Sequence, residues 1–171
     1  MKPILTLLIA ALGLLTARTY SADETTVRSS EELEAKFKET MTAATMSGRW
    51  CPLKDGVLGA EKDDKYTIVS VEKKNGSSWV INARMKYGER EVVAPIPVQV
   101  KWAGDTAVII VDQLRVPGGA AQGGAGYGGT AYSARVLIHD HTYAGTWSGG
   151  DHAGLMNGII TNDKAAPASK P

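Results

Sequence analysis

The chain has a single cysteine among its 171 residues, Cys51, so it cannot form an internal disulfide. This excludes a disulfide-stapled scaffold. We interpret Cys51 as a small buried apolar residue, with an intermolecular disulfide or a reactive thiol as alternatives. A cysteine nucleophile needs a base beside the thiol, and no motif around Cys51 marks one.

The chain also lacks an apolar run of the length that crosses a membrane, about 20 residues. Its most apolar stretch is the start, MKPILTLLIAALGLLTARTYSA, with an early lysine, a short apolar run and small residues at Ser21-Ala22. This pattern is typical of a secretory signal peptide. We expect residues 1–22 to be removed, leaving a secreted or periplasmic protein without an integral membrane span. A retained N-terminal anchor is the alternative.

Neither charge sign dominates. The 19 basic and 18 acidic residues become 17 and 18 once residues 1–22 are removed. A net charge of −1 gives no electrostatic reason to expect nucleic acid or an anionic membrane as a partner.

Recognisable catalytic motifs are missing as well. The sequence has no G-x-S-x-G, and GAGYGG at 124–129 precedes a strand-like segment rather than the helix that a phosphate-binding loop requires. The sequence therefore favours a non-enzymatic protein over an enzyme without deciding between them, and we assign no catalytic residues and no cofactor.

All three histidines fall within LIHDHTYAGTWSGGDHAGL at 137–155. His139 and His141 have the H-x-H spacing of a metal site on a strand, with His152, Asp140 or Asp151 as a third ligand. However, HDHT and SGGDHAG are both typical of tight turns, and consecutive turns lie at opposite ends of a barrel. We interpret the histidines as turn residues and expect no metal.

One amphipathic helix is expected within the spacer and helix region 23–44. Ser29 and Glu32 form a capping box, and Leu33, Phe37 and Met41 make a narrow apolar stripe over 30–42. The stripe can dock on another surface but cannot form a core. After Thr161 the small, proline-containing segment is expected to be disordered, giving a tail at 163–171.

From residue 45 the apolar period becomes two, which predicts antiparallel strands with one buried face. Eight strand-like runs with short connections predict an all-β domain over 45–162, an up-and-down barrel or a sandwich. The expected strands are 45–51, 65–73, 77–87, 91–102, 106–116, 131–138, 142–148 and 154–161. Pro95 and Pro97 predict that part of their strand borders an edge or gap. The expected inward residues are Trp79, Ile81, Met85, Ile96, Val98, Trp102, Val108, Ile110, Val136, Ile138 and Trp147.

Gly48-Arg49-Trp50 opens the first expected strand and resembles the G-x-W signature of lipocalins and related calycin barrels. The resemblance implies a small ligand-binding barrel with the tryptophan closing one end. The chain departs from the family in lacking its cysteine pairs and an assignable arginine over the tryptophan. Gly145-Thr146-Trp147 repeats the tripeptide, and TWSGG is similar to a strand of the avidin family. The chain also resembles small exported bacterial proteins, which imply no function.

The sequence thus favours an exported, non-enzymatic barrel that binds a small apolar or amphipathic ligand. The alternatives are a structural or protein-interaction module with a filled barrel, and a metal-dependent enzyme that uses His139 and His141. Small inward residues at Ala83, Ala94, Ala134 and Gly145 favour a cavity over a filled barrel. Tyr127 lies near the centre of the glycine-rich loop 118–130, where it can cap an open end of the barrel. The expected ligand-binding residues are Trp50, Trp79, Trp102, Trp147 and Tyr127.

Overall fold

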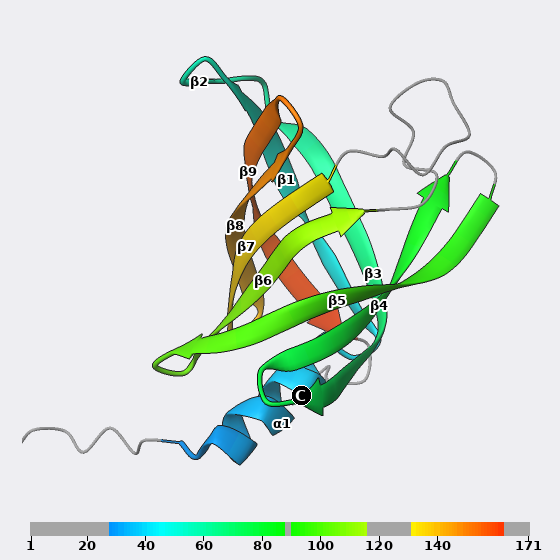
Figure 1. Cartoon of the computed structure of the whole chain (residues 1–171), viewed down its shortest axis with the longest axis vertical. Helices are drawn as coiled ribbons and strands as arrows, with labels where there is room; N and C mark the ends of the chain where they lie inside the picture. The colour runs from blue at the N-terminus through cyan, green and yellow to red at the C-terminus, as the bar shows by residue number, and fades with distance from the viewer. Residues whose placement is uncertain (1–27, 88–89, 116–130, 163–171) are drawn as a thin grey trace, which may run out of the picture.

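The computed structural model describes residues 28–87, 90–115 and 131–162. In this part of the chain one helix precedes nine strands (Figure 1). The expected signal peptide, the loop 118–130 with Tyr127, and the tail 163–171 lie outside the described residues. The elements are α1 (Ser30–Met41), β1 (Ala44–Lys54), β2 (Val57–Leu58), β3 (Lys62–Asn75), β4 (Ser78–Tyr87), β5 (Arg90–Ala103), β6 (Thr106–Arg115), β7 (Ala131–His139), β8 (Thr142–Gly149) and β9 (His152–Asn162).

The strands form a closed antiparallel barrel. This confirms the expected all-β class and the barrel, and it excludes the alternative sandwich. Each long strand pairs with the next in sequence, from β1 and β3 through to β8 and β9. The barrel closes where β1 pairs with β9, in an unbroken register from Ala44↔Asn162 to Leu53↔Ala153. The short β2 pairs with the end of β1 and adds no wall to the barrel.

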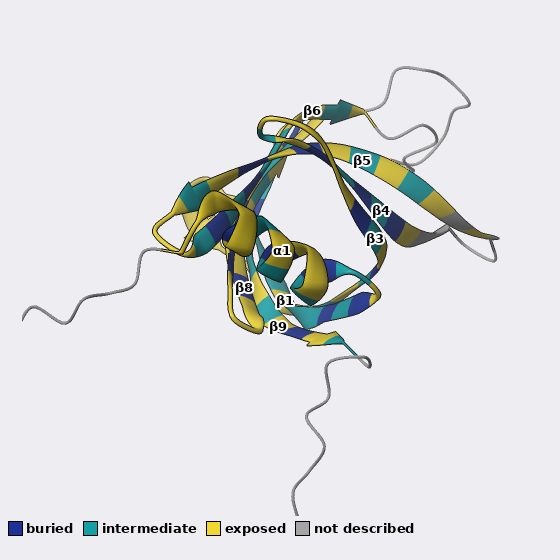
Figure 2. Cartoon of the chain, turned by 90° about the horizontal axis from the view of Figure 1, so that it is seen from below, coloured by how far each residue is buried: buried dark blue, intermediate teal, exposed yellow. Residues whose placement is uncertain are grey.

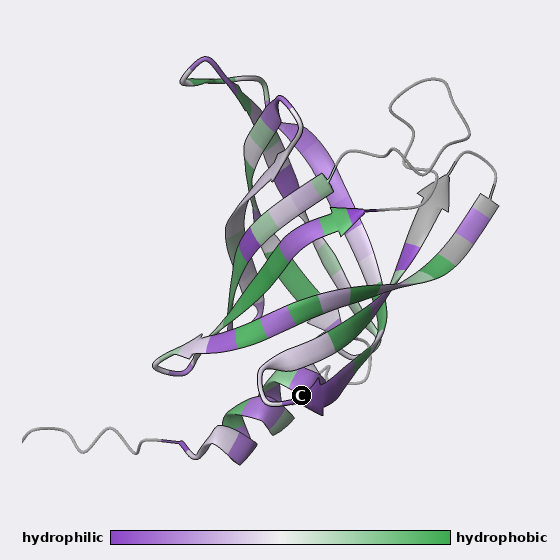
Figure 3. Ribbon diagram, in the orientation of Figure 1, coloured by the Kyte–Doolittle hydropathy of each residue, from purple (hydrophilic) through white to green (hydrophobic). Residues whose placement is uncertain are grey.

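Apolar and polar residues alternate along the strands (Figure 3), and alternate apolar residues are buried in the core, as the period of two predicts. One strand contradicts the expected faces. Ala107 and Ile109 are buried in the core, whereas Val108 and Ile110 face outward and are only partly buried. Residues 107–111 of β6 are apolar without interruption, so alternation alone cannot assign their faces. Pairing decides it, because Ile109 lies opposite the buried Val100 and Val108 lies opposite the exposed Lys101.

The barrel wall is incomplete between β5 and β6. These strands pair only from Gln99↔Ile110 to Ala103↔Thr106, so residues 90–98 of β5 pair with β4 alone among the described strands. The backbone N–H of Val100 donates to the carbonyl of Ser77 on the β4 side at 2.8 Å. Along a strand, the backbone N–H groups of successive residues point alternately to the two neighbouring strands. The backbone nitrogens of Pro97 and Pro95 therefore face the side where β5 is unpaired. The predicted position of both prolines at a gap is confirmed.

Helix α1 covers one end of the barrel (Figure 2). Its capping box is present as predicted, with Ser29 N–H donating to Glu32 at 2.8 Å and Glu32 N–H to the Ser29 hydroxyl at 3.2 Å. The stripe of Leu33, Phe37 and Met41 is buried against the barrel. Within the described residues, no helix is long and apolar enough to cross a membrane. We call the end covered by α1 the helix end, and the opposite end the far end.

Candidate ligand-binding site

The four tryptophans do not form one site but two pairs at opposite ends of the barrel. At the helix end the Phe37 ring lies edge-on to Trp79 and Trp102, at centroid distances of 5.4 and 6.2 Å. At the far end Trp50 lies edge to face with Trp147, at 5.6 Å and 70°. Trp79 and Trp102 therefore belong to the packing under the helix. The G-x-W tryptophan, Trp50, lies at the end that the helix leaves uncovered.

Packing under the helix leaves little room beside Phe37. A cavity of only about 20 Å³ remains between α1 and the strands there, close to the volume that holds a single water. It is lined by Leu33, Lys36, Phe37, Thr40, Trp102, Asp105, Ala107, Ile138 and Asp140.

On the inner face of β8 and β9, large aromatic residues lie opposite glycines, from Tyr143 near the helix end to Trp147 in the far half. Tyr143 pairs with Gly158, and Trp147 pairs with Gly154. A β-carbon on Gly158 would lie 2.7 Å from the Tyr143 ring, and one on Gly154 would lie 2.7 Å from Nε1 of Trp147. Both rings therefore lie directly on the backbone of β9, and this side of the wall carries little side-chain bulk of its own.

A carboxylate enters the barrel from β3. Asp64 pairs with Gly48, and Tyr66 pairs with the core residue Met46. Cross-strand partners share a face of the sheet, so Asp64 and Tyr66 point inward. An open hollow of about 360 Å³ also borders β1 and β3 here, but Ser47, Asp63 and Lys65 in its lining face outward, so it is not part of the barrel interior.

Two buried polar atoms in this region have no hydrogen-bond partner among the described residues, Oδ2 of Asp64 and the hydroxyl of Tyr143. Tyr143 is only 2% exposed. Leaving a buried polar group unpaired costs about 1–3 kcal/mol, and more when the group is charged. Two unpaired polar atoms therefore destabilise the folded protein unless a group outside the described residues, such as a ligand, forms hydrogen bonds with them.

The two tyrosines respond to the Asp64 charge. Burial raises the pKa of the Tyr143 phenol, and the negative charge of Asp64 raises it further. Burial and a hydrogen bond to Asp64 raise the pKa of Tyr66, with Tyr143 adding to the effect. Both phenols therefore stay neutral at physiological pH. Asp64, Tyr66 and Tyr143 form one interacting group, which we call the Asp64 cluster.

A cation–π contact lies beside the cluster. Lys62 pairs with Trp50 across β1 and β3, and its Nζ lies 4.9 Å from the centroid of the Trp50 ring. This geometry is attractive because the face of an indole is electron-rich.

Sequence reasoning missed the Asp64 cluster. In KDDKYTI the alternation places Lys62, Asp64, Tyr66 and Ile68 on one face, but all of the first four residues are charged, and the sequence therefore predicts a strand that begins only at Lys65. The signal that identifies Asp64 is its pairing with Gly48, which depends on the fold.

The histidines lie in a turn or directly beside one, as the turn interpretation predicts. His139 ends β7, and Asp140 has a φ of 49°, which breaks the strand period before His141 in the turn. His152 begins β9 directly after the next turn, at the opposite end of β8. Within the described ranges, no group of three histidine, cysteine or acidic residues could hold a metal.

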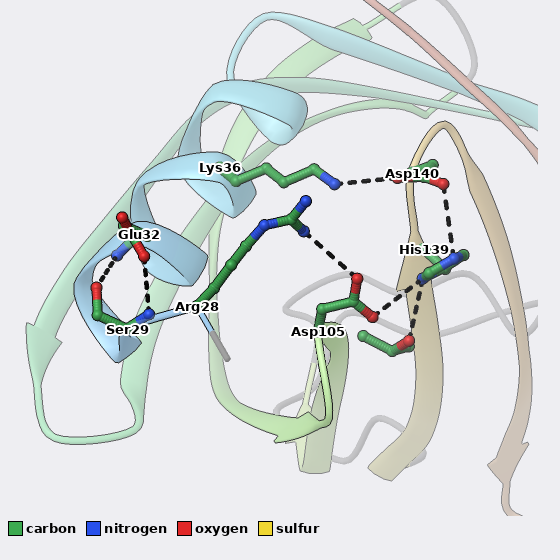
Figure 4. Close-up of polar contacts among 8 residues, drawn as sticks. Arg28, Ser29, Glu32, Lys36, Asp105, His139 and Asp140 are labelled. Atoms are coloured by element: carbon green, nitrogen blue, oxygen red, sulfur yellow. Dashed lines mark hydrogen bonds and ion pairs between the residues drawn. The ribbon is translucent and has the colours of Figure 1, made fainter. Parts of the chain in front are cut away.

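His139 instead lies in a polar network that joins α1 to the barrel (Figure 4). Lys36 binds Asp140 at 3.0 Å, and Arg28 lies 3.4 Å from Asp105. His139 lies between the two acids, 3.7 Å from Asp105 and 3.5 Å from Asp140. This network links the helix to the turns and strands beneath it.

Cys51 departs from its expected burial. It lies on the outer face of β1, opposite Leu155, and is only partly buried. The alternation of β1 explains this, since the neighbouring Trp50 takes the inner face.

Comparisons of the chain with protein-family models, with curated protein sequences and with solved structures found no match.

Proposed function

We propose that this protein is an exported, non-enzymatic barrel that binds a small apolar or amphipathic molecule in its interior, between the Asp64 cluster and the far end. The observation that carries the proposal is the pair of unpartnered buried atoms, Asp64 Oδ2 and the Tyr143 hydroxyl. A bound molecule with a polar group would satisfy both. Polar groups that converge in an apolar interior are the usual mark of a small-molecule site.

Small residues on the inner face of the barrel support an interior site. Ala83, Ala94, Ala134 and Gly145 all lie on the inner face, as their pairing with core residues requires. Eight-stranded barrels have an interior just wide enough to be filled by side chains or to hold one small ligand. Small inward residues favour the second arrangement.

Of the five residues expected to bind ligand, Trp50 and Trp147 remain in the proposal because they lie at the uncovered end. Trp79 and Trp102 pack under Phe37, so we no longer propose them as ligand-binding residues. Tyr127 lies outside the described residues. The likeness to lipocalins is proposed at the level of barrel and interior ligand. The likeness does not extend to the end closed by α1, because Trp50, the tryptophan of the G-x-W tripeptide, lies at the far end instead.

The test is native mass spectrometry of the protein purified from a secreting host, compared with its denatured mass. We expect a reproducible additional mass of a small molecule that is lost on denaturation. A bare chain that also binds no added amphiphile would contradict the proposal and favour a filled barrel acting through its surface. An additional mass equal to a transition metal, absent from a His139→Ala/His141→Ala variant, would favour the metal-dependent enzyme instead.

A further inference from the structure

We infer that the interior site selects amphipathic molecules with a cationic amine head group, held between Asp64 and Tyr143. This inference rests on the proposed function, because it names the chemical class of the ligand that the barrel would hold. It draws on the charge, the hydrogen-bonding capacity and the surroundings of the Asp64 cluster.

The first argument is charge. Asp64 makes no ion pair with any residue that the structure describes, although one of its carboxylate oxygens is buried. Of the cations nearest in sequence, Lys62 lies over Trp50, and Lys65 pairs with the outward Ser47 on the other face of β3. Arg49, on the neighbouring strand, binds Glu61 at 2.9 Å. A neutral hydrogen-bond donor would satisfy the oxygen but leave the buried charge uncompensated. An ammonium group satisfies both.

The second argument is hydrogen-bonding capacity. An ammonium group has three N–H donors and no acceptor. Oδ2 of Asp64 accepts one hydrogen bond, and the neutral Tyr143 hydroxyl accepts another through a lone pair. The hydrogen bond of the Tyr66 phenol to the carboxylate, which also raises the pKa of Tyr66, leaves Oδ2 of Asp64 without a partner among the described residues.

The third argument is the surroundings. The edge-to-face pair of Trp50 and Trp147 offers apolar surface to the body of a ligand at the far end of the barrel. The contact of Lys62 with Trp50 demonstrates that this indole already faces a cation. A ligand with a carboxylate head would instead be repelled by Asp64.

The experiment compares three amphiphiles that share a chain and differ in head group: decylamine, decanol and decanoate, each below its critical micelle concentration at neutral pH. Binding is followed by tryptophan fluorescence and by calorimetry. We expect decylamine to bind at least about tenfold more tightly than the other two, as a charge-assisted hydrogen bond in a buried site implies. Asp64→Asn should remove this preference and leave decanol binding unchanged.

The matched control is Asp63→Asn, which removes the same charge from the adjacent, exposed residue on the outer face of β3. It should leave the affinity for decylamine unchanged. Tyr143→Phe is the second variant, and it should weaken decylamine binding several-fold. It keeps the inference testable even where Asp64→Asn fails to fold.

Equal binding of decanol and decylamine, or equal losses in Asp63→Asn and Asp64→Asn, would overturn the amine inference and leave the ligand-binding barrel intact. An additional native mass from a molecule without an amine would do the same. Failure of all three amphiphiles together with a bare native mass would overturn both.

Discussion

The hydroxyl of Tyr143 lies 2.6 Å from the position that a β-carbon on Gly48 would occupy, so the ring depends on the absence of a side chain there. The same β-carbon would lie 2.0 Å from the backbone carbonyl of Asn157, which cannot move away freely. Gly48→Ala should therefore lower the free energy of unfolding by about 1–3 kcal/mol, the usual cost of overpacking. Urea unfolding measures this, with Ser47→Ala on the adjacent outward position as the control. An unchanged midpoint for Gly48→Ala would contradict the close approach of β1 and β9.

Tyr143→Phe should not destabilise the ligand-free protein, although most buried tyrosines lose stability when their hydroxyl is removed. The hydroxyl has no hydrogen-bond partner among the described residues, so the substitution removes an unpaired polar atom and can raise stability by about 1 kcal/mol. Thermal unfolding of the protein stripped of ligand tests this. Tyr66→Phe is the comparison, because its hydroxyl is hydrogen-bonded to Asp64 and its loss should be the more costly. A large loss in Tyr143→Phe would mean that the hydroxyl has a partner.

Phe37→Ala should strongly destabilise the docked helix. The ring is 3% exposed and contacts both Trp79 and Trp102, and removal of a core phenylalanine costs about 3–5 kcal/mol. The near-ultraviolet circular dichroism of the tryptophans should weaken as the edge contacts disappear. Lys38→Ala, an exposed position on the same helix, should change neither quantity. Retention of the tryptophan signal in Phe37→Ala would argue against the helix as the cover of this end.

Acid should weaken the attachment of α1 to the barrel. The hydrogen bond from Lys36 and the charge of Lys36 lower the pKa of Asp140, with His139 and His141 adding to the effect. A carboxyl group with a lowered folded-state pKa contributes stability above its unfolded pKa of about 3.9, and this is lost as the pH falls through the folded value. Thermal midpoints measured down through this range should fall less steeply in Asp140→Asn than in the parent protein. Asparagine tolerates the positive φ at this position, so the backbone is preserved.

Asp151→Asn is the control for this pH dependence, because Asp151 lies in the turn at the opposite end of β8 and has no contact with α1. It should follow the parent protein. Parallel curves for the parent and Asp140→Asn would mean that Lys36 and Asp140 do not hold the helix.

Alternation and capping were sufficient to predict most of the fold. Glu32 three residues after Ser29 marked the helix start, and strands with polar outer faces, such as the one around Trp79 to Ala83, were assigned to the correct inner face. The uniform apolar run of β6 was not, because its pattern has no polar face and only the pairing with Val100 fixes the orientation.

The site was less predictable because it depends on contacts between distant strands. Trp50 and Trp147 are almost a hundred residues apart, and the sequence does not distinguish them from Trp79 and Trp102. Only the direction of each strand relative to α1 separates the two pairs. A charged residue such as Asp64 is ordinarily expected to face solvent, so the sequence groups it with the surface acids. Gly48, whose lack of a side chain leaves room for Asp64, lies on another strand.

The two prolines of β5 decide how an interrupted barrel behaves in solution. An unpaired strand edge is a template on which another chain can add a strand, and such edges lead to aggregation. Pro95 and Pro97 face that edge and have no N–H to donate, so two successive donors that an incoming strand needs are missing. These prolines therefore make the edge that β5 shows in the described residues a poor template for strand addition by a second copy of the chain.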